Sequence, residues 1–191
     1  GTDQADRERL ADTATRMWDH LADRVDRSDD VAVVSWLGYD PPDVVPGALD
    51  VRAADDGAAA LVGEVRSLRA GGAERVIVVG HSYGGVVAGR ALLAGMDADA
   101  VVYMGAPGLG APGVLEAAAE RGVELRAVRA PADPIGVVAG AAPGLYGPDG
   151  VGAVPSLPHT GRGHSAYLSD AVLLDAVAGL AVGPGSPTGR G

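Results

Sequence analysis

The chain has 191 residues, 47% of them hydrophobic, which predicts a single globular domain with a core of its own. Acidic residues outnumber basic ones by 25 to 15, and the resulting net charge of −10 argues against a nucleic-acid partner or an anionic membrane surface. The absence of cysteine excludes disulfides and thiolate metal sites, and no apolar run reaches the roughly 18 residues of a membrane span.

Helical and strand patterns alternate along the chain. Residues 7–25 place apolar side chains on one helical face, and residues 31–36 form a short apolar run typical of a buried strand. The later predictions are strands over 75–79, 99–104 and 123–129, helices over 57–70, 84–95, 113–121 and 165–180, and a loop over 130–163. Four strands separated by helices predict an α/β fold: a parallel sheet with helices on both faces and ligands at the carboxyl ends of its strands.

The organisation predicted is one domain over residues 1–182, followed by a flexible tail over 183–191 that is rich in Gly and Pro. The chain opens on Gly1-Thr2 without Met. The sequence does not fix the compartment, because a soluble cytoplasmic protein and a secreted one whose upstream signal was removed both fit. It does not fix the oligomeric state either.

Residues 80–84 read Gly-His-Ser-Tyr-Gly, directly after a β-branched strand and directly before a helix. This setting is typical of a nucleophile elbow, which holds a serine in strained backbone angles. Side chains at positions 80 and 84 are expected to collide with the neighbouring strand and helix. We expect the helix N-terminus to favour developing negative charge, and the backbone N–H of Tyr83 to donate to an oxyanion. The alternative interpretation is a Gly-rich turn with an ordinary helix-capping serine.

A serine becomes a good nucleophile when a base, itself oriented by an acid, takes its proton. In chains with this type of elbow the acid follows the serine and the histidine comes last. Asp133 lies just beyond the strand at 123–129 and is the predicted acid, with Asp149 as the alternative. His164, in the loop before the last helix, is the predicted base, with His159 as the alternative.

Five segments in this order resemble a known family. They are W-L-G-Y-D-P-P-D (36–43), V-G-H-S-Y-G (79–84), M-G-A-P-G (104–108), A-P-A-D-P-I (130–135) and G-H-S-A-Y (163–167). Together they resemble the DUF1023 group of α/β-hydrolases, found mostly in high-GC actinobacteria. The resemblance implies an α/β-hydrolase-like sheet, with Ser82, Asp133 and His164 as a catalytic triad. It also implies that residues 36–40 line the rim of the active site.

Four residues are predicted to line the substrate pocket: Trp36, Gly38, Tyr39 and His81. Members of the family have an earlier strand whose P-G-T-G-T-like loop supplies a second oxyanion donor. Gly1-Thr2 is interpreted as the end of that loop, so the N-terminal strands are expected to be missing and one sheet edge to be unprotected. Losing one oxyanion donor costs on the order of 10²–10³ in rate.

The function predicted is a serine hydrolase that cleaves small-molecule or lipid-like carboxylic esters through an acyl-enzyme intermediate, without a cofactor or metal. One alternative is a hydrolase fold that is weakly active or inactive and serves as a binding module. Another is a dinucleotide-binding domain, because residues 108–113 match G-x-G-x-x-G and Asp133 follows 20 residues after Gly113. The short helix that follows and Pro112 argue against that reading. The stretch 136–163 is expected to form either an apolar acyl pocket or flap, or a plain surface loop.

Overall fold

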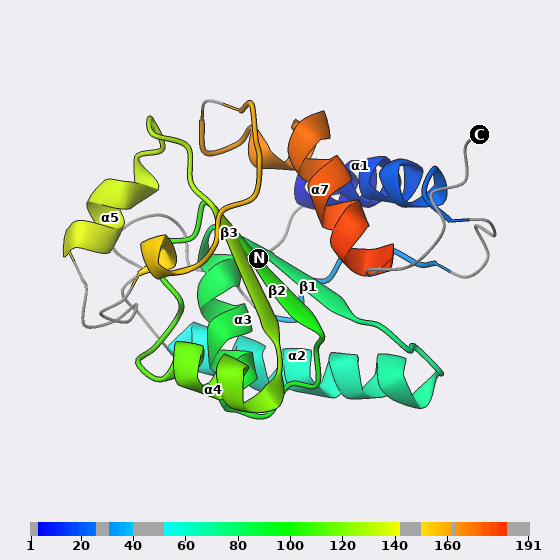
Figure 1. Ribbon diagram of the computed structural model, residues 1–191, viewed down its shortest axis with the longest axis horizontal. Helices are drawn as coiled ribbons and strands as arrows, with labels where there is room; N and C mark the ends of the chain where they lie inside the picture. The colour runs from blue at the N-terminus through cyan, green and yellow to red at the C-terminus, as the bar shows by residue number, and fades with distance from the viewer. Residues whose placement is uncertain (1–3, 26–30, 40–51, 142–149, 162, 183–191) are drawn as a thin grey trace.

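The computed structural model describes residues 4–25, 31–39, 52–141, 150–161 and 163–182 (Figure 1). Its helices are α1 (Gln4–Ala22), α2 (Arg52–Ala70), α3 (Tyr83–Leu93), α4 (Val114–Arg121), α5 (Ile135–Ala141) and α7 (Ala171–Val182). Its strands are β1 (Ile77–His81), β2 (Ala100–Met104) and β3 (Glu124–Val128), and η3 (Val151–Ala153) and η4 (Tyr167–Ser169) are 3-10 turns. The tail over 183–191, Asp40 and Gly1-Thr2 lie outside the described residues.

The three strands form one parallel sheet in the order β1-β2-β3. The register pairs His81 with Met104, and Met104 with Val128, so all three strands end at the same edge. A short parallel bridge joins Ala127 of β3 to Ser156 on the far side. The segments that leave the three strands therefore start side by side, at the edge where the sequence predicts the site.

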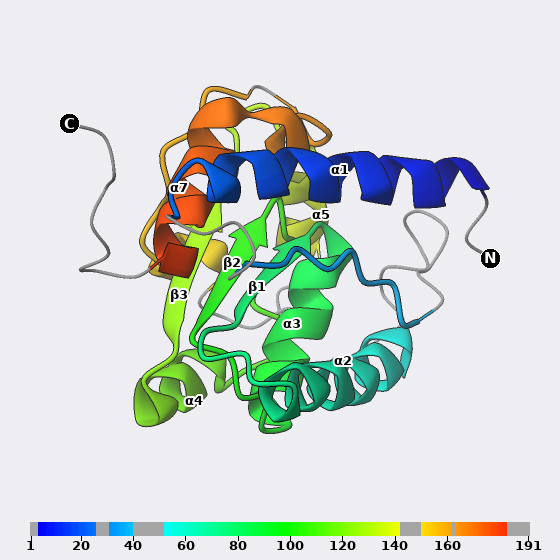
Figure 2. The same cartoon turned by 90° about the vertical axis from the view of Figure 1, so that its right-hand side faces the viewer.

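Side chains of β2 alternate between two cores, because successive residues of a strand point to opposite faces. Val101 and Tyr103 pack with α2, α3 and α4, whereas Val102 and Met104 pack with α1 and α7. Figures 1 and 2 show these two groups of helices on opposite sides of the sheet. Every residue of β2 is buried, as expected for the central strand of a sheet that is covered on both faces.

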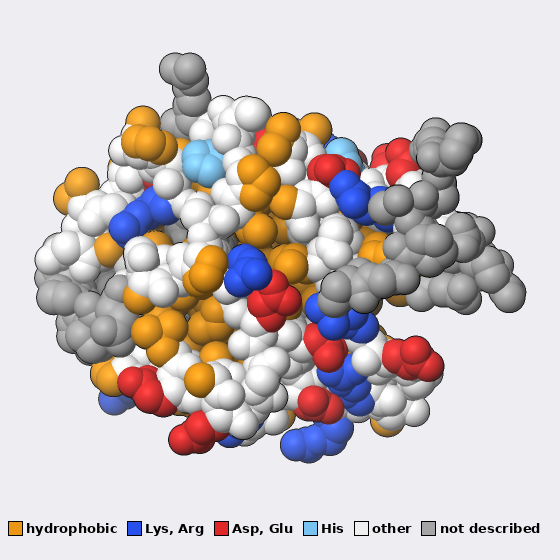
Figure 3. Space-filling view, viewed as in Figure 1, with side chains coloured by type: hydrophobic (Ala, Val, Ile, Leu, Met, Phe, Trp, Pro, Cys, Tyr) orange, Lys and Arg blue, Asp and Glu red, His pale blue; other side chains and the backbone are white. Residues whose placement is uncertain are grey.

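Charged side chains of both signs lie on the surface of the chain (Figure 3). On the face drawn in Figure 3, arginine side chains lie beside acidic ones, and apolar side chains gather between them. Within the described part of the chain, no helix combines the length and the apolar character needed to cross a bilayer.

The prediction of a buried strand over 31–36 was wrong. The segment carries no strand pairing, and Val34 is 51% exposed. Val31 and Val33 pack against the α1–α7 core, while Ser35 Oγ donates a hydrogen bond to Leu10 O at 2.7 Å. An apolar run encodes a surface that packs, but a strand also needs a neighbouring backbone, and no described strand pairs with this segment.

The predicted loop over 130–163 contains α5 and η3, so that prediction was also wrong in part. These two short helical elements form despite the high Gly and Pro content on which the loop prediction was based. Val151, Val154 and Leu157 are buried in the two cores. These three side chains therefore serve the packing of the fold, and residues 142–149 of the same stretch lie outside the described residues.

Candidate active site

Ser82 lies at the turn between β1 and α3 with φ 54° and ψ −125°, and it is the one non-glycine residue with a positive φ in the described part of the chain. Two backbone hydrogen bonds hold it there: its N–H donates to Met104 O at 2.9 Å, and its carbonyl accepts from Gly85 N at 3.0 Å. Such backbone angles cost a non-glycine residue on the order of 1–3 kcal/mol. The serine is therefore kept in a strained conformation by the strand before it and the helix after it.

The glycines around Ser82 allow the helix to approach the strand closely, but not as the sequence predicted. A Cβ at Gly80 would lie 2.7 Å from three backbone atoms of Gly84 and Gly85. A Cβ at Gly84 would meet nothing within 4 Å, so the expected collision at that position was wrong. The crowding falls one residue later, because a Cβ at Gly85 would lie 2.5 Å from Ala106 Cβ.

A chain of hydrogen bonds connects three side chains above the carboxyl edge of the sheet. Ser82 Oγ lies 2.9 Å from His164 Nε2. His164 Nδ1 lies 3.0 and 3.1 Å from the two carboxylate oxygens of Asp133. An ionised carboxylate only accepts, so Nδ1 carries the proton and Nε2 of the neutral ring accepts from the serine hydroxyl. The structure thus brings together the three residues that the sequence singled out.

Asp133 is buried, with its side chain wholly shielded from solvent, yet its environment favours the charged form. Burial alone would raise the pKa of this carboxyl, but hydrogen bonds from Tyr167, the backbone N–H of Ile135 and His164 outweigh it and lower the pKa. The N–H of Ile135 donates to Oδ1 at 2.9 Å, and the hydroxyl of Tyr167 donates to Oδ2 at 2.6 Å. The carboxylate is therefore both ionised and fixed in orientation.

Two residues of this cluster received no role from the sequence. Tyr167 stands in the quoted G-H-S-A-Y segment, three residues after His164, and that one-turn spacing was the available signal. Gly105, directly after β2, has φ 55°. A Cβ there would lie 2.4 Å from the Tyr167 ring and 2.9 Å from Asp133 Oδ2. Glycine at this position leaves the room in which the cluster assembles.

The loop that carries His164 is tied to α7 by Asp170. Its carboxylate accepts hydrogen bonds from the N–H groups of Thr160 and Gly161, both at 2.5 Å. The same carboxylate caps α7 by accepting from Val172 N and Leu173 N at 3.1 and 3.3 Å. This buried aspartate closes the base of the loop against the start of the helix.

His81, predicted to line the pocket, supports the same loop from the sheet side. Its Nε2 lies 2.8 Å from the carbonyl of His164, so Nε2 carries the proton and donates. The two rings lie 4.9 Å apart. Burial lowers the pKa of His81, which favours the neutral ring that this contact uses.

The remaining predicted pocket residues gather beside the elbow. The ring centroids of Trp36 and Tyr39 are 6.1 Å apart, and so are those of Tyr39 and Tyr83. The three rings therefore form a row that ends at Tyr83, the residue directly after Ser82. Gly38 lies under the Trp36 ring, where a Cβ would approach ring atoms to 2.3 Å. Burial, followed by the neighbouring Tyr83, raises the pKa of Tyr39 to about 12. Tyr39 therefore stays neutral near neutral pH.

The alternative site residues have different surroundings. His159 has a buried Nδ1 with no hydrogen-bond partner among the described residues, and Asp149 lies outside them. In the G-x-G-x-x-G loop, Gly110 packs on α3, and a Cβ there would lie 2.5 Å from Val86 O. Residues 105–110 are all buried. Gly110 is therefore used to pack the loop against α3, which argues against a dinucleotide-binding role for this motif.

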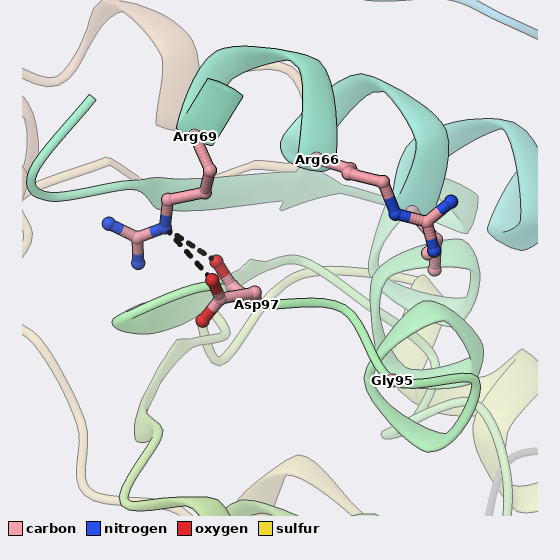
Figure 4. A pocket seen from close by; sticks show the side chains of 5 residues that line it. Arg66, Arg69, Gly95 and Asp97 are labelled. Carbon is pink, nitrogen blue, oxygen red and sulfur yellow. Dashed lines mark hydrogen bonds and ion pairs between the residues drawn. The ribbon is translucent and has the colours of Figure 1, made fainter. Parts of the chain in front are cut away.

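A hollow at the opposite edge of the sheet is lined by Val62, Arg66, Arg69, Gly95 and Asp97 (Figure 4). Arg69 donates to backbone carbonyls of Asp97, Ala73 and Glu74 and to the carboxylate of Asp99. Its guanidinium is thus occupied by acceptors of the chain itself. The hydrogen bonds of Arg69 thus connect the end of α2 to the segment before β2.

Comparisons with known proteins agree with the fold. A family model described as alpha/beta hydrolase matches residues 2–143, a span that includes Ser82 and Asp133 but not His164. Uncharacterized proteins from two strains of Mycobacterium tuberculosis are each 38% identical over 93 residues, which is 46% of this chain and 14% of theirs. The matched region is therefore a small part of these longer relatives. No solved structure matches the chain.

Proposed function

Because the chain belongs to the alpha/beta hydrolase family, we propose that it is a serine hydrolase that cleaves carboxylic esters through Ser82, His164 and Asp133. Within the family we assign it to the DUF1023 group, on the five segments quoted above. The observation that carries the proposal is the continuous contact from Ser82 Oγ to His164 Nε2 at 2.9 Å and from His164 Nδ1 to Asp133 at 3.0 Å. These are the contacts that a nucleophile, a base and an orienting acid require.

In the proposed reaction, Ser82 Oγ attacks the ester carbonyl and His164 Nε2 takes its proton. The imidazolium then gives that proton to the leaving alcohol as the acyl-enzyme forms. A water molecule attacks the acyl carbon with His164 again as base, and the imidazolium then returns this proton to Ser82 Oγ as the acyl–oxygen bond breaks and the carboxylic acid is released. Asp133 stays ionised throughout and stabilises the imidazolium, in keeping with the lowered pKa of its carboxyl.

The negative charge that develops on the carbonyl oxygen is proposed to face the start of α3. Tyr83 is the first residue of that helix and directly follows Ser82, so its N–H is the proposed oxyanion donor. The helix dipole adds to the stabilisation. Gly1-Thr2, interpreted from the sequence as the end of the loop that supplies a second donor in the family, lies outside the described residues.

The substrate is proposed to enter beside the aromatic rings of Trp36, Tyr39 and Tyr83. These rings present apolar surface next to the elbow, which suits a small-molecule or lipid-like ester. His81 is proposed to support the site by holding the His164 loop through its hydrogen bond to the carbonyl of His164. Trp36 also provides a fluorescent group on this side of the site.

Hydrolysis of p-nitrophenyl acetate and butyrate tests the proposal. The wild type is expected to release nitrophenol, and Ser82→Ala is expected to be slower by about three orders of magnitude or more. Ser67→Ala, on the exposed surface of α2, is the matched control and is expected to retain the wild-type rate. Equal rates for wild type and Ser82→Ala would refute the proposed function. They would favour a hydrolase fold that binds a ligand without cleaving it.

A further inference from the structure

Tyr167 holds a buried position between the acid and the base of the proposed triad. Its side chain is 0% exposed. The hydroxyl lies 2.6 Å from Asp133 Oδ2 and 2.7 Å from the backbone N of Ala130. An amide N–H can only donate, so the hydroxyl accepts from Ala130 and its single proton goes to the carboxylate. The direction of both hydrogen bonds is therefore settled by the chemistry of the groups.

These two bonds join segments that are far apart in the sequence. Ala130 and Asp133 follow β3, whereas Tyr167 and His164 belong to the loop before α7. The Tyr167 ring also stands edge-on to the ring of His164, with centroids 6.4 Å apart and planes at 85°. A shift of the histidine loop relative to β3 would therefore disturb the Tyr167 contacts together with the contact between His164 and Asp133.

The Tyr167 hydroxyl donates to the carboxylate oxygen of Asp133 that does not accept the backbone hydrogen bond from Ile135. The N–H of Ile135 donates to Oδ1, while Tyr167 donates to Oδ2. With a fixed donor on each oxygen, the carboxylate cannot rotate about its Cβ–Cγ bond without losing a charge-assisted hydrogen bond. Burial, followed by the bond to Asp133, raises the pKa of Tyr167 to about 12, so the hydroxyl keeps its proton near neutral pH.

We infer that Tyr167 is a positioning residue for the proposed ester hydrolysis: its hydroxyl orients the Asp133 carboxylate and locks the His164 loop to the end of β3. This inference rests on the proposed function. The ring fills space above Gly105, whereas the hydroxyl sets the geometry of proton transfer. Removing the hydroxyl alone therefore separates positioning from packing.

Tyr167→Phe is the first test, measured on p-nitrophenyl butyrate. Its kcat is expected to fall about 10–100-fold, which corresponds to the loss of one hydrogen bond to a charged group, while KM stays within about twofold. Tyr103→Phe is the matched control, because it removes a hydroxyl from another fully buried tyrosine whose oxygen has no partner among the described residues. A kcat for Tyr167→Phe within twofold of the control would overturn the inference.

A double-mutant cycle with Asp133→Asn shows whether Tyr167 acts through the acid. In the Asp133→Asn background, adding Tyr167→Phe is expected to lower kcat by less than about threefold, because the group that it positions is already gone. If the two losses multiply, the hydroxyl acts independently of Asp133 and the inference fails.

A third measurement remains decisive if Tyr167→Phe does not fold. Replacing Tyr167 with difluorotyrosine keeps the ring and hydroxyl but makes the phenol more acidic. Its ionisation beside Asp133 is expected to produce a loss of kcat toward alkaline pH that the same replacement at Tyr103 does not show. Identical pH profiles for the two proteins would overturn the inference. A rate that depends on Ser82 but not on Tyr167 leaves the proposed function standing, whereas a rate independent of Ser82 removes both.

Discussion

The strain at the elbow predicts that the stability of a Ser82 variant depends on whether glycine or alanine replaces the serine. Ser82→Ala and Ser82→Gly both delete the hydroxyl and its bond to His164, so that loss cancels in a comparison of the two variants. They differ in the Cβ, which alanine keeps at φ 54° and glycine lacks. The backbone bonds to Met104 O and from Gly85 N hold this conformation in both.

The magnitude follows from two opposing terms. Relief of the strained backbone favours glycine by about 1–3 kcal/mol. The greater freedom of glycine in the unfolded chain costs about 0.5–1 kcal/mol relative to alanine. Ser82→Gly is therefore expected to exceed Ser82→Ala in unfolding free energy by up to about 2.5 kcal/mol. For a domain of this size that corresponds to a Tm higher by up to about 10 °C.

Urea denaturation and thermal melting followed by circular dichroism measure this difference, provided that both variants show the same m-value. A glycine variant that is less stable than the alanine variant would show that residue 82 is not strained. The elbow would then be an ordinary turn with a capping serine.

Other positions give independent expectations for the free energy of unfolding. Gly80→Ala is expected to lose about 1–3 kcal/mol because its Cβ meets backbone at 2.7 Å, whereas Gly84→Ala, with open space, is expected to stay within about 1 kcal/mol of wild type; similar losses in urea melts would contradict this packing. Tyr103→Phe is expected to have a free energy of unfolding about 1 kcal/mol higher than wild type, because it removes a buried hydroxyl that has no partner among the described residues. A lower free energy of unfolding would show that the hydroxyl has a partner outside them. For Asp170, burial raises the pKa but hydrogen bonds from Gly161, Thr160 and Leu173 lower it overall, so its stabilisation is present above the unfolded pKa of about 3.9 and is lost as pH falls through the folded value. Asp170→Asn is therefore expected to be less stable by about 1–3 kcal/mol at neutral pH and to lose less stability than wild type on acidification; parallel pH curves would contradict this.

The parts of the fold that the sequence predicted are those encoded by local pattern. The three β-branched or apolar runs that became β1, β2 and β3 each follow a segment with helical periodicity, so a parallel sheet was predictable. The elbow was predictable because strand, tight turn and helix are contiguous. The approximate places of Asp133 and His164 followed from chain order, because parallel strands end at one edge.

The parts that the sequence did not predict depend on contacts between distant segments. The run at 31–36 looks like a strand, but strand formation needs a paired backbone. Tyr167 lies in a quoted motif, yet its role exists only because the loop folds back onto Ala130. The crowding at Gly85 instead of Gly84 depends on which helical residue faces Ala106. Each of these outcomes is set by tertiary packing, which a local pattern does not contain.

The central claim is that Ser82 is an activated nucleophile, and covalent labelling with a fluorophosphonate tests it most directly. Trypsin releases residues 76–90 as one peptide, in which Ser82 is the single serine, so mass spectrometry assigns an adduct there without ambiguity. The account predicts stoichiometric labelling of this peptide in the folded wild-type protein. Labelling is expected to be much slower in His164→Ala and absent in Ser82→Ala. A folded wild-type protein that leaves this peptide unmodified, or that reacts no faster than His164→Ala, would contradict it.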